Sequence, residues 1–228
     1  MQVHSLPTSN PHFSLQPQSY RIRRARGAEL ERVSDAVFDA YYPRFSAMHG
    51  WAGDERDKMR RDDARYALDA SVFVAYTEDG QILATVRAIE RREHPLPIEQ
   101  DFGVDPLVVC QGFGWVPHRI FEIGRFARCA IPGVTEAVAH RAVDEVLASL
   151  VAHCGRHLDN VAFASIDVAV LELLRRKGFP FLALGEPVPY LGSPTVPVVI
   201  QLGVCAQQMA ARNRVAYAQY FGTLDQAA

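Results

Sequence analysis

The pattern of apolar and polar residues along the chain predicts strands and helices in a mixed order. Short apolar runs between turn residues are typical of buried strands, and apolar residues at helical spacing are typical of amphipathic helices. The predicted strands cover residues 19–25, 71–76, 82–89, 118–129, 161–164, 179–184 and 196–202. The predicted helices cover residues 28–42, 135–154, 167–177 and 206–220, and Pro43 is expected to end the first of them. This order predicts an α/β protein, with a mixed sheet and helices on both faces.

Three connections between these elements carry further signals. Asp79-Gly80 lies between two predicted strands and is the strongest hairpin signal in the chain. Residues 49–70 are highly charged and lack a clear apolar face, so they are either a solvated surface or a lid over a site. Residues 91–117 are rich in proline and glycine and predict a long structured loop, which in a compact domain is usually functional or mobile.

Length and composition indicate a globular protein with one large domain or with a domain and an appendage. The chain has 228 residues, of which 49% are apolar and 22% charged, and its net charge of −2 gives no sign of general nucleic-acid affinity. We expect a flexible arm at residues 1–18, the main domain at residues 19–203, and a helix and tail at residues 204–228.

Several observations predict a cytoplasmic protein. No apolar run is long enough to cross a bilayer, and the N-terminus does not have the pattern of a secretory signal. The four cysteines lie far apart, without a C-x-x-C pair, which suits a reducing compartment.

The predicted strand at residues 118–129 contains the most informative residues. In the run Phe121–Ala127, an otherwise apolar sequence is broken by Glu122, Gly124 and Arg125. Charges are costly to bury without a partner, and side chains three apart on a regular strand point to opposite faces. A bulge near Gly124 would bring both charges to one face. They would then either line a cleft or form a structural ion pair at a sheet edge.

Other familiar sites are absent from the sequence. It has no G-x-x-x-x-G-K-[ST] loop, no G-x-G-x-x-G loop and no G-x-S-x-G elbow. His153, Cys154 and His157 lie close together, but a closed metal site needs three or four ligands. We interpret them as ordinary residues at the end of a helix and expect no metal.

The stretch Asp167–Phe179 resembles the fourth-helix signature of the GNAT acyltransferase superfamily, N-x-x-A-x-x-L-Y-x-x-x-G-F. Leu174 stands at the position of the tyrosine, which in acetyl-coenzyme A enzymes often protonates the leaving thiolate. Residues 131–139 stand where ordinary members carry a glycine-rich loop for the pyrophosphate of coenzyme A, and they lack that pattern.

A branch of the superfamily without that loop resembles the chain at more points. It comprises the acyl-homoserine-lactone (autoinducer) synthases and the N-acyl amino acid synthases. Glu122–Ala127 is similar to their E-[IV]-S-R-[FL]-[AC] strand, with Gly124 in place of serine. Weaker similarities are Asp79-Gly80 followed by Arg87, residues 96–99, and the set Trp51, Asp62 and Asp63. The resemblance implies a GNAT-like, mostly antiparallel twisted sheet that is splayed at its fourth strand.

The resemblance also implies a reaction. An N-acyltransferase would move a fatty acyl chain from acyl carrier protein, or from coenzyme A, to a primary amine, most simply that of an amino acid. The acyl thioester would be a co-substrate, and no bound cofactor is expected. One alternative is an autoinducer synthase that uses S-adenosylmethionine, and another is a GNAT-like module that binds without catalysis.

The resemblance also implies roles for specific residues. Glu122 is the candidate general base. The candidate substrate-binding residues are Arg125, Arg87, Phe126, Gly124 and Trp51. Arg87 and Arg125 could bind the carboxylate of the acceptor or hold Glu122 and the acids of the lid, and for Arg87 we prefer the second role. The arginines at positions 21, 23, 24 and 26, and the run 175–177, could dock the acidic carrier protein or simply be solvated charges.

Overall fold

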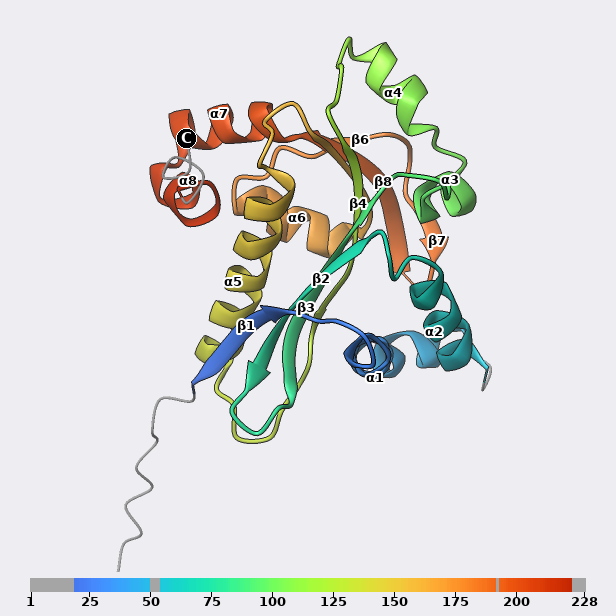
Figure 1. Ribbon diagram of the computed structural model, residues 1–228, viewed down its shortest axis with the longest axis vertical. Coiled ribbons are helices and arrows are strands. Elements are labelled where there is room, and N and C mark those ends of the chain that lie inside the picture. Colours follow the sequence, from blue (N-terminus) through green and yellow to red (C-terminus); the bar gives the residue numbers. More distant parts are fainter. Residues whose placement is uncertain (1–18, 50–53, 192, 223–228) are drawn as a thin grey trace, which may run out of the picture.

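The computed structural model describes residues 19–49, 54–191 and 193–222 (Figure 1). Within these residues, eight strands form one sheet in the order β1-β2-β3-β4-β5-β8-β6, and β7 pairs with β8. The pairing of β4 with β5 is parallel and the other pairings are antiparallel. The strands are β1 (Tyr20–Arg24), β2 (Ala70–Thr77), β3 (Ile82–Glu90), β4 (Ile120–Arg128), β5 (Val161–Asp167), β6 (Leu182–Ala183), β7 (Val188–Tyr190) and β8 (Ser193–Gln201). The mixed, mostly antiparallel sheet predicted above is confirmed.

Helices cover both faces of the sheet, as the sequence predicted. Figure 1 shows α1 (Glu29–His49) and α2 (Glu55–Arg65) on one side and α5 (Glu136–Cys154) on the other. The remaining helices are α3 (Pro97–Phe102), α4 (Pro106–Gly112), α6 (Val168–Arg176), α7 (Leu202–Arg212) and α8 (Arg214–Tyr220). Buried apolar side chains form two clusters, one containing Val37 of α1 and the other Leu150 of α5. The sheet therefore separates an α1 face from an α5 face.

The predicted end of the first helix at Pro43 is wrong. Helix α1 continues through this proline to His49. A proline removes one backbone hydrogen bond and favours a kink, but it does not prevent the next residues from being helical.

The interpretation of residues 91–117 as one long loop is also wrong, because the segment contains α3 and α4. Each helix has proline at its first position, where the missing N–H is not needed. Asp105 caps α4, since its carboxylate accepts the N–H groups of Leu107 at 2.8 Å and of Val108 at 3.3 Å. Asp105-Pro106 is thus a helix-start signal, which the interpretation of the segment as a loop from its proline and glycine content overlooked.

The C-terminal part differs from the prediction in detail. Only Leu182 and Ala183 of the expected strand 179–184 are in a strand, and β7 was not expected. The expected helix 206–220 begins earlier, at Leu202, and is divided at Asn213, which caps α8. Both helices contribute to the apolar cluster on the α5 face, so they pack on the main domain.

Some predictions concern residues that lie outside the described ranges. These are the N-terminal arm at residues 1–18, the last six residues of the tail, and Trp51. The domain limits at residues 18 and 203 stay predictions. Among the helices that the structure describes, none has the length and apolar character needed to cross a membrane.

Candidate functional site

Strands β4 and β5 separate halfway along their length. In the described part of the chain, their ladder runs from Ile120 and Val161 to Ile123 and Ala164 and ends there. On its other side β4 stays paired with β3, but with a register shift that sets Arg125 and Phe126 opposite the single residue Val86. This is the bulge predicted near Gly124, and the splayed fourth strand is confirmed with it.

The bulge places Arg125 in a backbone conformation that is uncommon for residues other than glycine, with φ at 52°. Such conformations cluster at functional sites and persist only where the surrounding contacts hold them. Here the contact is an ion pair with a carboxylate of α2, described below.

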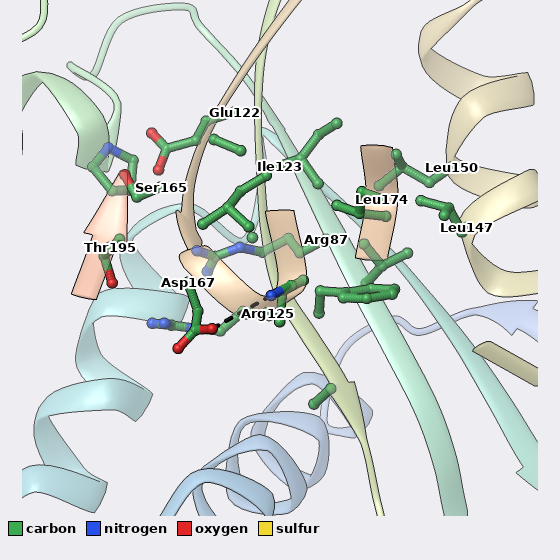
Figure 2. A pocket seen from close by; sticks show the side chains of 18 of the residues that line it. Arg87, Glu122, Ile123, Arg125, Leu147, Leu150, Ser165, Asp167, Leu174 and Thr195 are labelled. Atoms are coloured by element: carbon green, nitrogen blue, oxygen red, sulfur yellow. Dashed lines mark hydrogen bonds between the residues drawn. The ribbon is translucent and has the colours of Figure 1, made fainter. Parts of the chain in front are cut away.

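A cavity of about 670 Å³ occupies the gap between the two strands and extends to both faces of the sheet. On parallel strands, residues directly opposite each other share a face, so Glu122 and Phe163 point to the α1 face and Ile123 and Ala164 to the α5 face. Figure 2 shows Leu147, Leu150 and Leu174 together on one side of the cavity and Glu122, Ser165 and Thr195 on the other. The cavity therefore has an apolar half under α5 and a polar half under α2 and α3.

Glu122 lies in the polar half, at the edge of the gap. Its side chain is buried, and one carboxylate oxygen, Oε2, accepts the backbone N–H of Ile98 in α3 at 2.8 Å. Burial raises the pKa of Glu122 to about 7, against the opposing effects of the Ile98 hydrogen bond and the charge of Arg87. A carboxyl group with this pKa can accept and return a proton near neutral pH.

Arg87 and Arg125 converge on one carboxylate, that of Asp63 in α2. Arg87 Nη1 lies 2.5 Å from Asp63 Oδ1, and Arg125 Nε donates to the same oxygen at 2.8 Å. Burial alone would raise the pKa of Asp63, but the two guanidinium groups hold it below its usual range. Arg87 therefore contacts an acid of residues 49–70, the segment predicted to be either a solvated surface or a lid. The two arginines and Asp63 together carry one net positive charge.

The other predicted binding residues take different places. Gly124 and Phe126 line the cavity, and a Cβ added at Gly124 would meet only Arg87 Nη2, at 3.8 Å. Leu174, at the position of the tyrosine in the GNAT pattern, lines the apolar half. Trp51 lies outside the described residues. The functional role of each residue stays a prediction.

Three polar residues that the sequence did not single out also line the cavity. Tyr190 of β7 donates a hydrogen bond to Asp101 Oδ2 at 2.6 Å, and burial raises the pKa of Tyr190. Ser165 of β5 is the third. Neither Tyr190 nor Asp101 lies in an element that the hydrophobic pattern predicted, so no local signal marked them.

Comparison with solved structures identifies proteins with a similar fold. The chain is similar to FeeM, an N-acyl amino acid synthase from uncultured soil microbes, with 15% identity, a TM-score of 0.62, and coverage of 84% of this chain and 95% of FeeM. The chain therefore has a GNAT-like fold similar to that of FeeM. The AHL synthase LasI matches with 16% identity, a TM-score of 0.59, and coverage of 90% of this chain and 96% of LasI.

A third solved structure, TofI in a ternary complex with an inhibitor and MTA, matches with 20% identity, a TM-score of 0.55, and coverage of 84% of this chain and 95% of TofI. No protein-family model and no curated protein matches the sequence. At such low identities the likeness concerns the fold, so the chemistry must be argued from the side chains of the splayed site.

Proposed function

We propose that the chain is an N-acyltransferase that moves a fatty acyl group from a thioester to the amine of an amino acid. One observation carries the proposal: a buried carboxyl group with a pKa of about 7 stands where the apolar and polar halves of one cavity meet. A thioester whose chain fills the apolar half would have its carbonyl carbon in the gap between β4 and β5, beside Glu122.

The proposed reaction needs one proton carrier. The acceptor ammonium first releases one proton to solvent and becomes a neutral amine. Glu122 takes the second proton from this nitrogen, directly or through water, as the nitrogen attacks the thioester carbonyl carbon. The C–N bond forms and the carbonyl π electrons move to oxygen. Collapse of this intermediate breaks the C–S bond, and the leaving thiolate takes the proton back from Glu122. The products are an amide and a thiol, and no tyrosine is needed at position 174.

The charges of the site favour a zwitterionic amino acid as acceptor. Ionised Glu122 attracts the ammonium group, and the excess positive charge of Arg87, Arg125 and Asp63 attracts the carboxylate. S-adenosylmethionine carries an additional sulfonium charge, which two buried guanidinium groups would repel. The autoinducer synthase remains the second candidate, because the folds of LasI and TofI are also similar.

The donor side of the proposal is acyl carrier protein. Arg21 in β1 and Arg26 just after it are exposed. Arg23 and Arg24 are exposed too, but Arg23 pairs with Glu29 and Arg24 donates to the carbonyl of Ala70. In the second basic run, Arg175 contacts Glu172 and Lys177 contacts Asp144. The exposed arginines near β1 are therefore the better candidate for docking an acidic carrier protein.

Mass spectrometry of lipid extracts tests the proposed reaction. Cells expressing the chain should accumulate N-acyl amino acids that are absent from cells expressing Glu122→Gln, and the product identifies the acceptor. Acyl-homoserine lactones would instead support the second candidate. If purified chain produces neither amide nor lactone from acyl carrier protein or acyl coenzyme A thioesters and the twenty amino acids or S-adenosylmethionine, the enzyme proposal is wrong.

Replacing Leu150 with phenylalanine should shorten the preferred acyl chain. Leu150 is buried and lines the apolar half, so a larger side chain removes space that the end of a long chain would fill. Each methylene that is excluded changes discrimination by about 10-fold or more, so the ratio of kcat/KM for long over medium chains should fall at least that much. Competition between donors of two lengths measures the ratio. Leu107→Phe, exposed on α4, is the matched control and should leave the ratio unchanged.

A further inference from the structure

Ser165 carries a buried hydroxyl group that the fold itself does not use. Its Oγ has no hydrogen-bond partner among the described residues, although the oxygen is shielded from solvent. Buried hydroxyl groups in folded proteins nearly always have a partner, so an orphan that lines a cavity points to a ligand. Thr195, the other hydroxyl-bearing side chain labelled in Figure 2, is already within 3.4 Å of the carbonyls of Tyr190 and Ser193.

Ser165 lies at the point of the sheet where β4 and β5 separate. The β4–β5 ladder ends at Ile123 and Ala164, so Ser165 and Gly124 are the first residues that face each other across the open gap. Alternation along β5 puts Ser165 on the same face as Phe163, which is also the face of Glu122. On its other side Ser165 is opposite Pro197 of β8, and Gly124 contributes no side chain to the gap.

We propose that the Ser165 hydroxyl, after rotation about χ1 toward the gap, donates a hydrogen bond to the carbonyl oxygen of the bound thioester. This inference rests on the proposed function, because that function places the reacting carbonyl in the gap. As the amine nitrogen bonds to the carbonyl carbon, the carbonyl oxygen becomes an oxyanion, and the Ser165 donor stabilises that charge more strongly than it stabilises the thioester. When the C–S bond breaks, the carbonyl re-forms and Ser165 keeps its own proton throughout.

Kinetics of Ser165→Ala test the role. Removing one oxyanion donor should lower kcat by about 10²-fold and raise the KM for the donor by up to about 10-fold, with the melting temperature nearly unchanged. Ser165→Thr keeps a hydroxyl group and should retain most of the activity. Ser149→Ala, on the far side of α5 from the cavity lining, is the matched control. A Ser165→Ala variant with kcat within threefold of the wild type, or one that changes KM alone, overturns the role.

A binding measurement separates this inference from the proposed function. Two donor analogues are compared by calorimetry: a ketone, in which CH₂ replaces sulfur, and a thioether, in which CH₂ replaces the carbonyl. The wild type should bind the ketone about 10-fold more tightly, and Ser165→Ala should abolish the difference. If the wild type shows this difference in binding but catalyses no acyl transfer, the Ser165 contact is supported and the proposed enzyme activity is wrong. If the wild type catalyses acyl transfer but binds the ketone and the thioether equally well, the enzyme activity is supported and the Ser165 contact is wrong.

Discussion

Replacing Glu122 with glutamine should lower the rate of acyl transfer by roughly 10³-fold, the typical contribution of a general base. Glutamine has nearly the same shape and its side-chain oxygen can still accept the N–H of Ile98, but it cannot take a proton from the attacking amine. Single-turnover assays with a pre-formed acyl donor measure the step directly. In the wild type, the rate should rise with pH through about 7, where Glu122 ionises.

The control for this comparison is Glu172→Gln. Glu172 is an exposed glutamate of α6 whose ion pair among the described residues is with Arg175 at the surface, so its substitution should leave the rate within twofold of the wild type. A Glu122→Gln enzyme that keeps more than a tenth of the wild-type rate would remove Glu122 from the mechanism.

The same variant should be more stable than the wild type at alkaline pH. The pKa of Glu122 is raised by burial from 4.5 to about 7 in the folded chain, so the folded state favours the protonated form. The raised pKa therefore contributes stability that is fully present below pH 4.5 and is lost as the pH rises through 7. The total loss in the free energy of unfolding is about 3 kcal/mol. Glutamine does not titrate and escapes this loss.

Urea unfolding at pH 4 and pH 8 measures the effect. The free energies of unfolding of Glu122→Gln and wild type should agree at pH 4, and the variant should exceed the wild type by up to about 3 kcal/mol at pH 8. If Glu122 were instead one half of a structural ion pair, the variant would be the less stable protein at pH 8. The experiment thus decides between the two interpretations that the sequence left open.

Replacing Asp63 with asparagine should destabilise the protein by about 4 kcal/mol, because the buried guanidinium of Arg87 and the largely buried one of Arg125 would lose the carboxylate between them. For a chain of this size that loss corresponds to a fall in melting temperature of about 8–16 °C, which calorimetry measures. The bulged backbone at Arg125 should also relax once its ion pair is gone, so acyl transfer should fall as well.

Two further variants make the Asp63 prediction specific. Asp57→Asn changes an exposed aspartate of the same helix and should shift the melting temperature by less than about 2 °C. Adding Arg87→Met to Asp63→Asn removes one of the uncompensated cations and should restore part of the lost stability. A loss below about 1 kcal/mol for Asp63→Asn would show that Arg87 and Arg125 do not depend on this carboxylate.

The sequence identified most strands and the long helices because their signals are local. The apolar run Phe121–Ala127 and the stripe of α5 specify an element by periodicity alone. The wrong predictions concern prolines, which local rules interpret as the end of a helix or as a sign of a loop. Helix α1 continues through Pro43, because a proline inside a helix costs a hydrogen bond without necessarily ending the helix. The proline-rich stretch 91–117 holds two helices that begin at prolines.

The sequence by itself predicted a buried strand that contains Glu122, Gly124 and Arg125, and it indicated that a bulge near Gly124 would bring the two charges to one face. Only the tertiary structure decided the partners. Asp63 lies 62 residues before Arg125, and Ser165 reaches the gap from another strand. Hydrophobic periodicity reports which side of an element is buried, whereas ion pairs, the raised pKa of Glu122 and the cavity depend on which distant segments pack against that side.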